Sequence, residues 1–159
     1  MGKTAVFPGS FDPFTIGHES IVQRALPLFD KIIIAIGMNA EKKALFSAAD
    51  RKKWIDKLFE HIPNVSSITY ESLTVELCKK YNAQYILRGL RTSVDFEYER
   101  AIAQNNKCLH PEIETVFMLT LPEHTHVNST IIRDIIRHKG DASSFLPAII
   151  AAEIKKSQP

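Results

Sequence analysis

The chain has 159 residues, 45% of them hydrophobic and 24% charged, which excludes a disordered or collagen-like protein. Its 20 basic and 18 acidic side chains give a net charge of +2, too balanced for a general nucleic-acid-binding protein. We expect one domain over residues 1–159. The longest apolar runs, Ile32–Ile36 and Phe145–Ala152, are too short to cross a membrane. A cytoplasmic protein is therefore expected, with no membrane partner, and its Cys78 and Cys108 should be reduced and buried.

The first part of the chain alternates between strand and helix patterns. Thr4–Phe7 is an apolar run that predicts a strand, and Pro8-Gly9 predicts a turn after it. His18–Phe29 has apolar residues at helical spacing, although Pro27 should distort the last turn. Lys31–Gly37 is rich in β-branched residues and predicts a strand covered on both faces.

The same alternation continues to the end of the chain. Ser47 is a candidate N-cap for a helix over Ala48–His61. The remaining elements, in chain order, are a strand at Val65–Tyr70, a helix at Thr74–Tyr81, a strand at Tyr85–Leu87, a helix at Val94–Leu109, a strand at Thr115–Leu119, a helix at Ser129–His138 ended by Gly140, and a helix at Phe145–Lys156.

Five apolar strands alternating with helices predict an α/β fold, a doubly wound five-stranded parallel sheet with helices on both faces. Ligands of such Rossmann-like sheets bind beyond the carboxyl ends of the strands, where the strand order reverses. The loops after the strands are therefore the expected place of the functional site.

The loop over residues 8–18 leads from the first strand to a helix N-terminus, which favours a phosphate site. It is neither a GxGxxG nor a Walker A motif. Ser10 could donate its hydroxyl to an anion or be an ordinary turn residue. His18 could donate a ring N–H to phosphate oxygens, or could instead cap the helix or pack locally. Asp12 before Pro13 is expected to stabilise the turn in preference to binding Mg²⁺.

Further polar residues follow the other strands, at the same predicted edge of the sheet. Lys42 follows the second strand, and Arg88 and Arg91 follow the fourth, where guanidinium groups suit phosphate. Lys42 could equally be a solvated surface lysine. Ser129 and Thr130 begin a helix, where simple capping and ligand contact are compatible.

Two other features have open alternatives. Glu99 is either a site carboxylate or an ordinary residue of a helix surface. His124 and His126 could suggest a metal, but no third ligand stands at a recognisable spacing, so we expect no protein-bound metal site.

Three motifs carry a resemblance that covers nearly the whole chain. The segment Gly9–His18 resembles the (H/T)xGH signature of the nucleotidylyltransferase superfamily. Arg88-Gly89-Leu90-Arg91, followed by Asp95–Glu99, resembles bacterial phosphopantetheine adenylyltransferases, and Asn128–Arg133 resembles their SSxxxR-type segment. Asn128 departs from that family by standing where serine is frequent, and Ile16 stands where a polar residue is common.

The resemblance implies an enzyme that moves AMP from ATP to 4′-phosphopantetheine, giving dephospho-CoA and pyrophosphate in coenzyme A biosynthesis. It further implies Mg²⁺ as cofactor, a homohexamer, and coenzyme A as feedback inhibitor. The catalytic residues it implies are His18, Lys42 and Arg91. It assigns ATP to Ser10, Phe11, His18, Gly89, Leu90, Arg91, Glu99, His124, Thr125, His126, Val127, Asn128, Ser129 and Thr130. It assigns phosphopantetheine to Ser10, Lys42, Thr74 and Arg88.

A mechanism follows as a hypothesis. The acceptor is itself a phosphate, so its oxygen can attack the α-phosphorus in line, with no covalent intermediate and no general base. The alternatives are a related nucleotidylyltransferase acting on nicotinate mononucleotide or glycerol phosphate, and a catalytically idle nucleotide-binding module.

Overall fold

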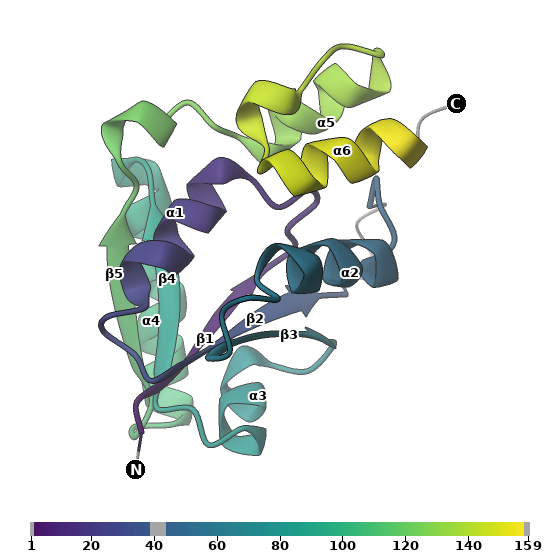
Figure 1. The fold of residues 1–159 in the computed structure, drawn as a ribbon. Coiled ribbons are helices and arrows are strands. Elements are labelled where there is room, and N and C mark those ends of the chain that lie inside the picture. The colour runs from purple at the N-terminus through teal and green to yellow at the C-terminus, as the bar shows by residue number, and fades with distance from the viewer. Residues whose placement is uncertain (1, 39–43, 158–159) are drawn as a thin grey trace.

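A computed structural model describes residues 2–38 and 44–157 of the chain. Its centre is one parallel sheet of five strands in the order β3-β2-β1-β4-β5 (Figure 1). The strands are β1 (Thr4–Gly9), β2 (Lys31–Gly37), β3 (Val65–Tyr70), β4 (Tyr85–Leu90) and β5 (Glu114–Leu119). The chain winds from β1 outward to β3, then crosses back to β4 beside β1. The doubly wound parallel sheet is thus confirmed, and its order reverses between β1 and β4.

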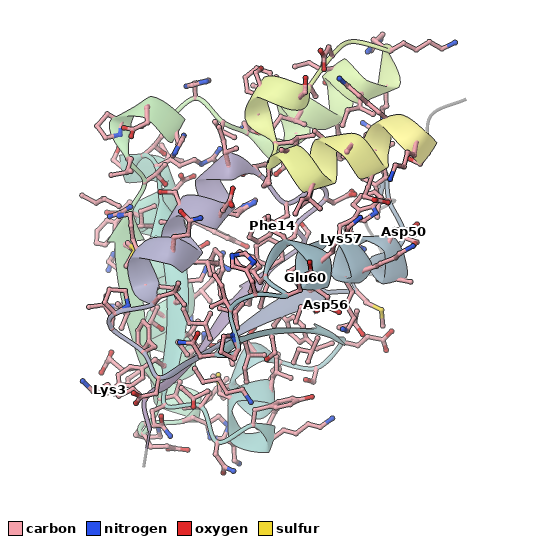
Figure 2. All side chains as sticks on the ribbon, viewed as in Figure 1. Lys3, Phe14, Asp50, Asp56, Lys57 and Glu60 are labelled. Carbon is pink, nitrogen blue, oxygen red and sulfur yellow. The ribbon has the colours of Figure 1, made fainter. Side chains whose placement is uncertain are left out.

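Helices cover both faces of this sheet (Figure 1). They are α1 (Ile16–Ala25), α2 (Ala48–Leu58), α3 (Thr74–Lys80), α4 (Ser93–Leu109), α5 (Ser129–Arg137) and α6 (Ala148–Ser157), with short 3₁₀ turns at Pro122–His124 and Ser143–Phe145. Helices α1, α2, α5 and α6 lie over one face, and α3 and α4 lie over the other. Lys57 of α2 forms an ion pair with Glu153 of α6 at 2.9 Å, which joins these two helices (Figure 2).

Alternate residues of the strands supply the two cores. Phe7, Ile34 and Leu87 pack under α1 and α2, and Phe14 fills the space between them (Figure 2). Val6, with its neighbours in β2 and β4, packs on α3. This period-two division explains why the central strands are apolar at nearly every position.

Two strands extend beyond the predicted ends. β1 continues through Pro8 and Gly9, which pair with Ala35 and Ile36 of β2. The missing N–H of Pro8 is tolerated because β1 pairs with β4 only nearer its N-terminal end, at Ala5 and Val6. β4 likewise continues through residues 88–90, which pair with β5.

Several predicted helix ends are wrong for local reasons. Helix α1 begins at Ile16 and ends at Ala25, so Pro27, which has no N–H to donate, lies outside the helix. Before α6, a 3₁₀ turn ends at Phe145, and the helix itself begins after Pro147. The Ser47 cap of α2 is confirmed, since its Oγ accepts the Asp50 N–H at 3.0 Å.

The end of α5 also differs from expectation. Lys139, with a φ of 60°, takes the left-handed position that usually belongs to glycine. Lys139 N–H donates to Ile136 O at 3.0 Å and Gly140 N–H to Ile135 O at 2.8 Å, a Schellman motif. Gly140 serves a different purpose, because a Cβ there would lie 2.8 Å from the Ile135 side chain.

The cysteines are both free, but only one is buried. Cys78 lies in the core, and burial raises the pKa of its thiol to about 11. Cys108 is exposed on α4, whose buried residue is Glu99.

Candidate active site

A cavity of about 800 Å³ opens where β1 and β4 part. The two strands pair at Ala5–Tyr85 and Val6–Ile86, and β4 then stays with β5 while β1 stays with β2. The space between them lies at the carboxyl ends of the strands, at the reversal of strand order. This is the place where α/β sheets bind ligands.

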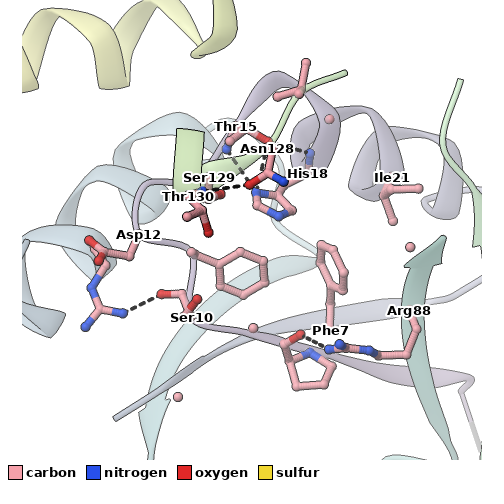
Figure 3. A pocket seen from close by; sticks show the side chains of 18 of the residues that line it. Phe7, Ser10, Asp12, Thr15, His18, Ile21, Arg88, Asn128, Ser129 and Thr130 are labelled. Carbon is pink, nitrogen blue, oxygen red and sulfur yellow. Dashed lines mark hydrogen bonds between the residues drawn. The ribbon is translucent and has the colours of Figure 1, made fainter. Parts of the chain in front are cut away.

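His18 is held by the N-terminus of α1 (Figure 3). Thr15 is the N-cap, and its Oγ1 accepts the His18 N–H at 3.3 Å. In return, the Thr15 N–H donates to His18 Nδ1 at 3.0 Å, which completes a capping box. Because Nδ1 accepts a hydrogen bond here, the neutral ring carries its hydrogen on Nε2. The capping role and the proposed donor role therefore use different nitrogens of one ring.

Three phenylalanines surround the His18 ring. The centroid of Phe11 lies 5.0 Å from it at a right angle, and those of Phe14 and Phe7 lie at 5.3 and 6.3 Å. Burial, and then the charges of Arg91 and Arg88, lower the pKa of His18 from 6.5 to about 3. His18 is thus a neutral hydrogen-bond donor near neutral pH.

Arg88 reaches the cavity from β4 and is already paired. Its Nε donates to Glu99 Oε2 at 2.7 Å, Nη2 donates to Glu99 Oε1, and Nη1 donates to Pro8 O (Figure 3). Glu99, on α4, is 9% exposed. The pair therefore bridges β4, α4 and β1.

Arg91 lies just past the end of β4. Its Nη1 donates to Val127 O at 3.1 Å, and its Nε lies 3.4 Å from Asp95 Oδ2. Arg91 therefore joins the start of α4 to the segment that leads into α5.

The N-terminus of α5 forms another wall (Figure 3). Asn128 is its cap, with Oδ1 accepting the Thr130 N–H at 2.8 Å. Ser129 Oγ donates to Pro13 O at 3.3 Å. Arg133 donates to Asp12 O at 2.9 Å and to Thr130 Oγ1 at 3.0 Å. These contacts fix α5 against the loop after β1.

The cavity brings together most of the residues predicted for the site. Those that line it are Ser10, Phe11, His18, Arg88, Gly89, Arg91, Glu99, His124, Val127, Asn128, Ser129 and Thr130. Leu90, Thr74, Thr125 and His126 do not line it: Leu90 is buried in β4, and Thr74 Oγ1 lies 3.2 Å from Tyr70 Oη. Lys42 lies outside the described residues. The roles of all these residues stay predictions.

Sequence reasoning left three cavity arginines out of the site. Arg133 and Arg137 line the cavity at four and eight residues after Ser129, on the same face of α5. This spacing was a usable signal. Arg51 of α2 also lines the cavity, and nothing in its local pattern distinguishes it from the lysines beside it.

Asp12 does more than stabilise a turn. Its carboxylate accepts the N–H groups of Leu45 at 2.7 Å and Phe46 at 3.0 Å, which ties the loop after β1 to the start of α2. Within residues 2–38 and 44–157, no group of three or more His, Cys, Asp or Glu side chains could hold a metal ion.

In the part of the chain that the structure describes, no helix is both long and apolar enough to span a membrane.

Comparison with known proteins gives a consistent family. The model of the cytidylyltransferase-like family matches residues 6–135. The phosphopantetheine adenylyltransferase of Flavobacterium psychrophilum is 53% identical over 93% of this chain and 97% of its own. Those of Cytophaga hutchinsonii and Leptospira biflexa are 52% and 46% identical, over 92% and 98% of this chain and 98% of each relative.

Solved structures support the fold at much lower identity. A putative nicotinate-nucleotide adenylyltransferase from Vibrio parahaemolyticus superposes with a TM-score of 0.70 at 20% identity, over 98% of this chain and 99% of that one. Given the family match over most of its length and relatives at about half identity, the chain belongs to the cytidylyltransferase-like family and, within it, to the phosphopantetheine adenylyltransferases.

Proposed function

We propose that the chain transfers the adenylyl group of ATP to 4′-phosphopantetheine, giving dephospho-CoA and pyrophosphate, as a step of coenzyme A biosynthesis. The observation that carries this proposal is the identity of 46–53% to relatives of that name over more than nine-tenths of the chain. Two polyanions must then share one site. A cavity lined by Arg51, Arg88, Arg91, Arg133 and Arg137 suits that need.

The reaction requires little covalent chemistry from the protein. An oxygen of the acceptor phosphate attacks the α-phosphorus of ATP, the bond from that phosphorus to the β-bridging oxygen breaks, and pyrophosphate leaves with the electron pair. His18 Nε2–H would donate to the oxygens on which charge develops, and its low pKa prevents it from acting as a base near neutral pH. Lys42 and Arg91 would complete the catalytic set by stabilising the same charge.

The two ligands would occupy different sides of the cavity. The nucleotide side would use the backbone at Ser10 and Phe11, together with Gly89, Arg91, Glu99, His124 and residues 127–130. The acceptor side would use Ser10, Arg88 and Lys42. Because the described side chains offer no ready cation site, we propose that Mg²⁺ enters as part of the substrate, bound by the phosphates of ATP.

An assembly of copies is part of the proposal. On α4, the side chains of Val94, Tyr98, Ile102 and Leu109 fall on one stripe and are 38–77% exposed. An apolar stripe of this size favours burial against another protein surface. We propose a homohexamer located in the cytoplasm, with coenzyme A as a feedback inhibitor that competes for the same cavity.

The experiment that tests this function is a pyrophosphate-release assay with ATP and Mg²⁺. The acceptors 4′-phosphopantetheine, nicotinate mononucleotide and glycerol 3-phosphate are offered in parallel. Turnover with phosphopantetheine alone is expected. Turnover with another acceptor would retain the mechanism and overturn the substrate, and ATP binding without any turnover would favour a regulatory module.

A further inference from the structure

Arg51 is a charged residue inside the protein, with 5% of its surface exposed. A buried charge is costly unless it is paired, and such an arginine ordinarily faces a carboxylate. Here, the hydrogen bonds of Arg51 to described residues go to backbone carbonyls. Nη1 donates to Ser10 O, and Nε donates to Phe46 O at 3.1 Å and to Ser47 O at 3.3 Å.

These carbonyls belong to two separate segments at the cavity wall. Ser10 is in the loop after β1, and the other two acceptors precede α2. Asp12 connects the same two segments in the opposite sense, since its carboxylate accepts from the N–H groups of Leu45 and Phe46. Arg51 donates from α2 to the loop after β1, and Asp12 in that loop accepts from the segment before α2. These side-chain hydrogen bonds fix the position of the loop relative to α2.

The hydrogen bond from Arg51 to Ser10 O also fixes the orientation of the Ser10–Phe11 peptide group. A trans peptide is planar, so fixing the Ser10 carbonyl fixes the Phe11 N–H in the opposite direction. Among the described residues, this N–H has no hydrogen-bond partner. Phe11 has a φ of 47°, a left-handed conformation that is unfavourable for a residue with a Cβ. A neighbouring contact must stabilise this conformation, and Arg51 supplies one.

We propose that Arg51 is a positioning residue of the active site. By holding the Ser10 carbonyl, it fixes the Ser10–Phe11 peptide, so that the Phe11 N–H is presented to a phosphate oxygen of the nucleotide. It also keeps the Phe11 ring against His18, at 5.0 Å between centroids. This inference deepens the proposed function and rests on it, because the nucleotide it invokes is the ATP of that reaction.

The test compares Arg51→Lys with Arg24→Lys. A lysine at position 51 keeps the charge but cannot reach carbonyls on both segments with one rigid fork. Arg24 is the matched control, because its Nη1 also donates to a distant backbone carbonyl, Leu119 O at 2.8 Å, and it does not line the cavity. Thermal unfolding, ATP affinity by calorimetry, and kcat are measured for both variants and the wild type.

We expect Arg51→Lys to remain folded, with kcat lowered about 10- to 100-fold and ATP bound more weakly, and Arg24→Lys to keep both values. Methylguanidinium should restore activity to Arg51→Ala, whereas methylammonium at the same ionic strength should not. Lower unfolding temperatures with unchanged kcat and ATP affinity would reduce Arg51 to a purely structural residue and overturn the proposal.

Two further readouts separate the possible failures. If the wild type does not turn over phosphopantetheine, the proposed function fails, but the ATP affinities still test Arg51. Hydrogen exchange at the Phe11 amide of the wild type needs no variant at all. Added ATP should slow this exchange if the N–H binds a phosphate oxygen, and an unchanged exchange rate would contradict the inference.

Discussion

The carboxylate of Glu99 holds the guanidinium of Arg88 by two parallel hydrogen bonds, from Nε at 2.7 Å and from Nη2 to the other oxygen. Paired planar groups of this kind are among the strongest side-chain contacts in proteins. The third nitrogen, Nη1, donates to Pro8 O. Arg88 is therefore held in one orientation before any ligand arrives, which lowers the entropy that binding must remove.

The first prediction concerns this pair. Glu99→Gln keeps the shape of the side chain but removes the charge that orients Arg88, so the KM for phosphopantetheine should rise. The free energy of unfolding should fall by about 1–3 kcal/mol. Steady-state kinetics and urea unfolding measure the two effects. Glu97→Gln is the control, because Glu97 pairs with Arg100 on the exposed surface and should cost less than about 1 kcal/mol.

The second prediction concerns the chemical step. In His18→Ala, the Nε2–H donor is lost from the reacting phosphate, so kcat should fall by about 10²- to 10³-fold. The affinity for ATP should change far less, because the arginines of the cavity remain. Kinetics and calorimetry on the same preparation separate the two quantities. Equal losses of kcat and ATP affinity would argue against a role in the transition state.

The third prediction concerns pH. The pKa of His18 is about 3 in the folded protein and near 6.5 in the unfolded chain, so between these values the unfolded state binds more protons. The contribution of His18 to stability is therefore complete above pH 6.5 and is lost progressively as the pH falls toward 3. Urea unfolding should show a smaller loss of stability from pH 7 to pH 5 in His18→Gln than in the wild type. Identical losses would mean that the folded protein does not keep the His18 ring neutral over this pH range.

The fourth prediction concerns Gly9, at the end of β1. A Cβ at this position would lie 2.8–3.1 Å from the ring of Phe11, which is itself 3% exposed and packed against His18. Gly9→Ala should therefore displace the Phe11 ring and lower kcat by a larger factor than Gly2→Ala. Gly2 is a suitable control because its added Cβ would meet only the side chain of Asp30, far from the cavity lining. Unaltered kinetics in Gly9→Ala would show that the ring contact does not matter for catalysis.

The fifth prediction concerns the end of α5. Lys139→Gly should stabilise the protein by about 0.5–1 kcal/mol, because glycine adopts the positive φ without steric cost. Gly140→Ala should destabilise it by about 1–3 kcal/mol, because the new methyl group collides with Ile135. Paired urea unfolding curves give both values. Destabilisation by Lys139→Gly, or stabilisation by Gly140→Ala, would contradict the strain at Lys139 and the collision at Gly140.

The sequence predicts an element well where the element's own pattern of apolar residues is enough to determine its structure. The limits of β2 and β3 agree with prediction, and β2 shows why, because its apolar run of mostly β-branched residues forms a strand buried on both faces. The extension of β4 through Arg88 and Gly89 could not be predicted, because these residues favour loops locally. They remain in the strand because β5 pairs with them and Glu99 neutralises the arginine.

The sequence predicts where the site lies better than it predicts the hydrogen bonds within the site. The loop after β1 and the helix start at Ser129 could be placed from turn and cap signals. The partners of Arg51 and Glu99 could not, because each contact joins residues 11 or 41 positions apart, on elements whose packing no local pattern specifies. His18 shows the same limit, since its depressed pKa depends on three phenylalanines and two arginines that gather only in the folded chain.

The parting of β1 and β4 has a consequence for how this fold can change. Beyond Val6 and Ile86, the backbone ladder between these strands ends, and the Arg88 contact with Pro8 O spans the gap. Besides the anion recognition that we propose for it, Arg88 thus contributes to the cohesion of the sheet. Replacing Arg88 to change the acceptor would also weaken the contact between β1 and β4 in the middle of the sheet. New specificities should therefore arise more readily on the loops and helix ends around the cavity than on this strand.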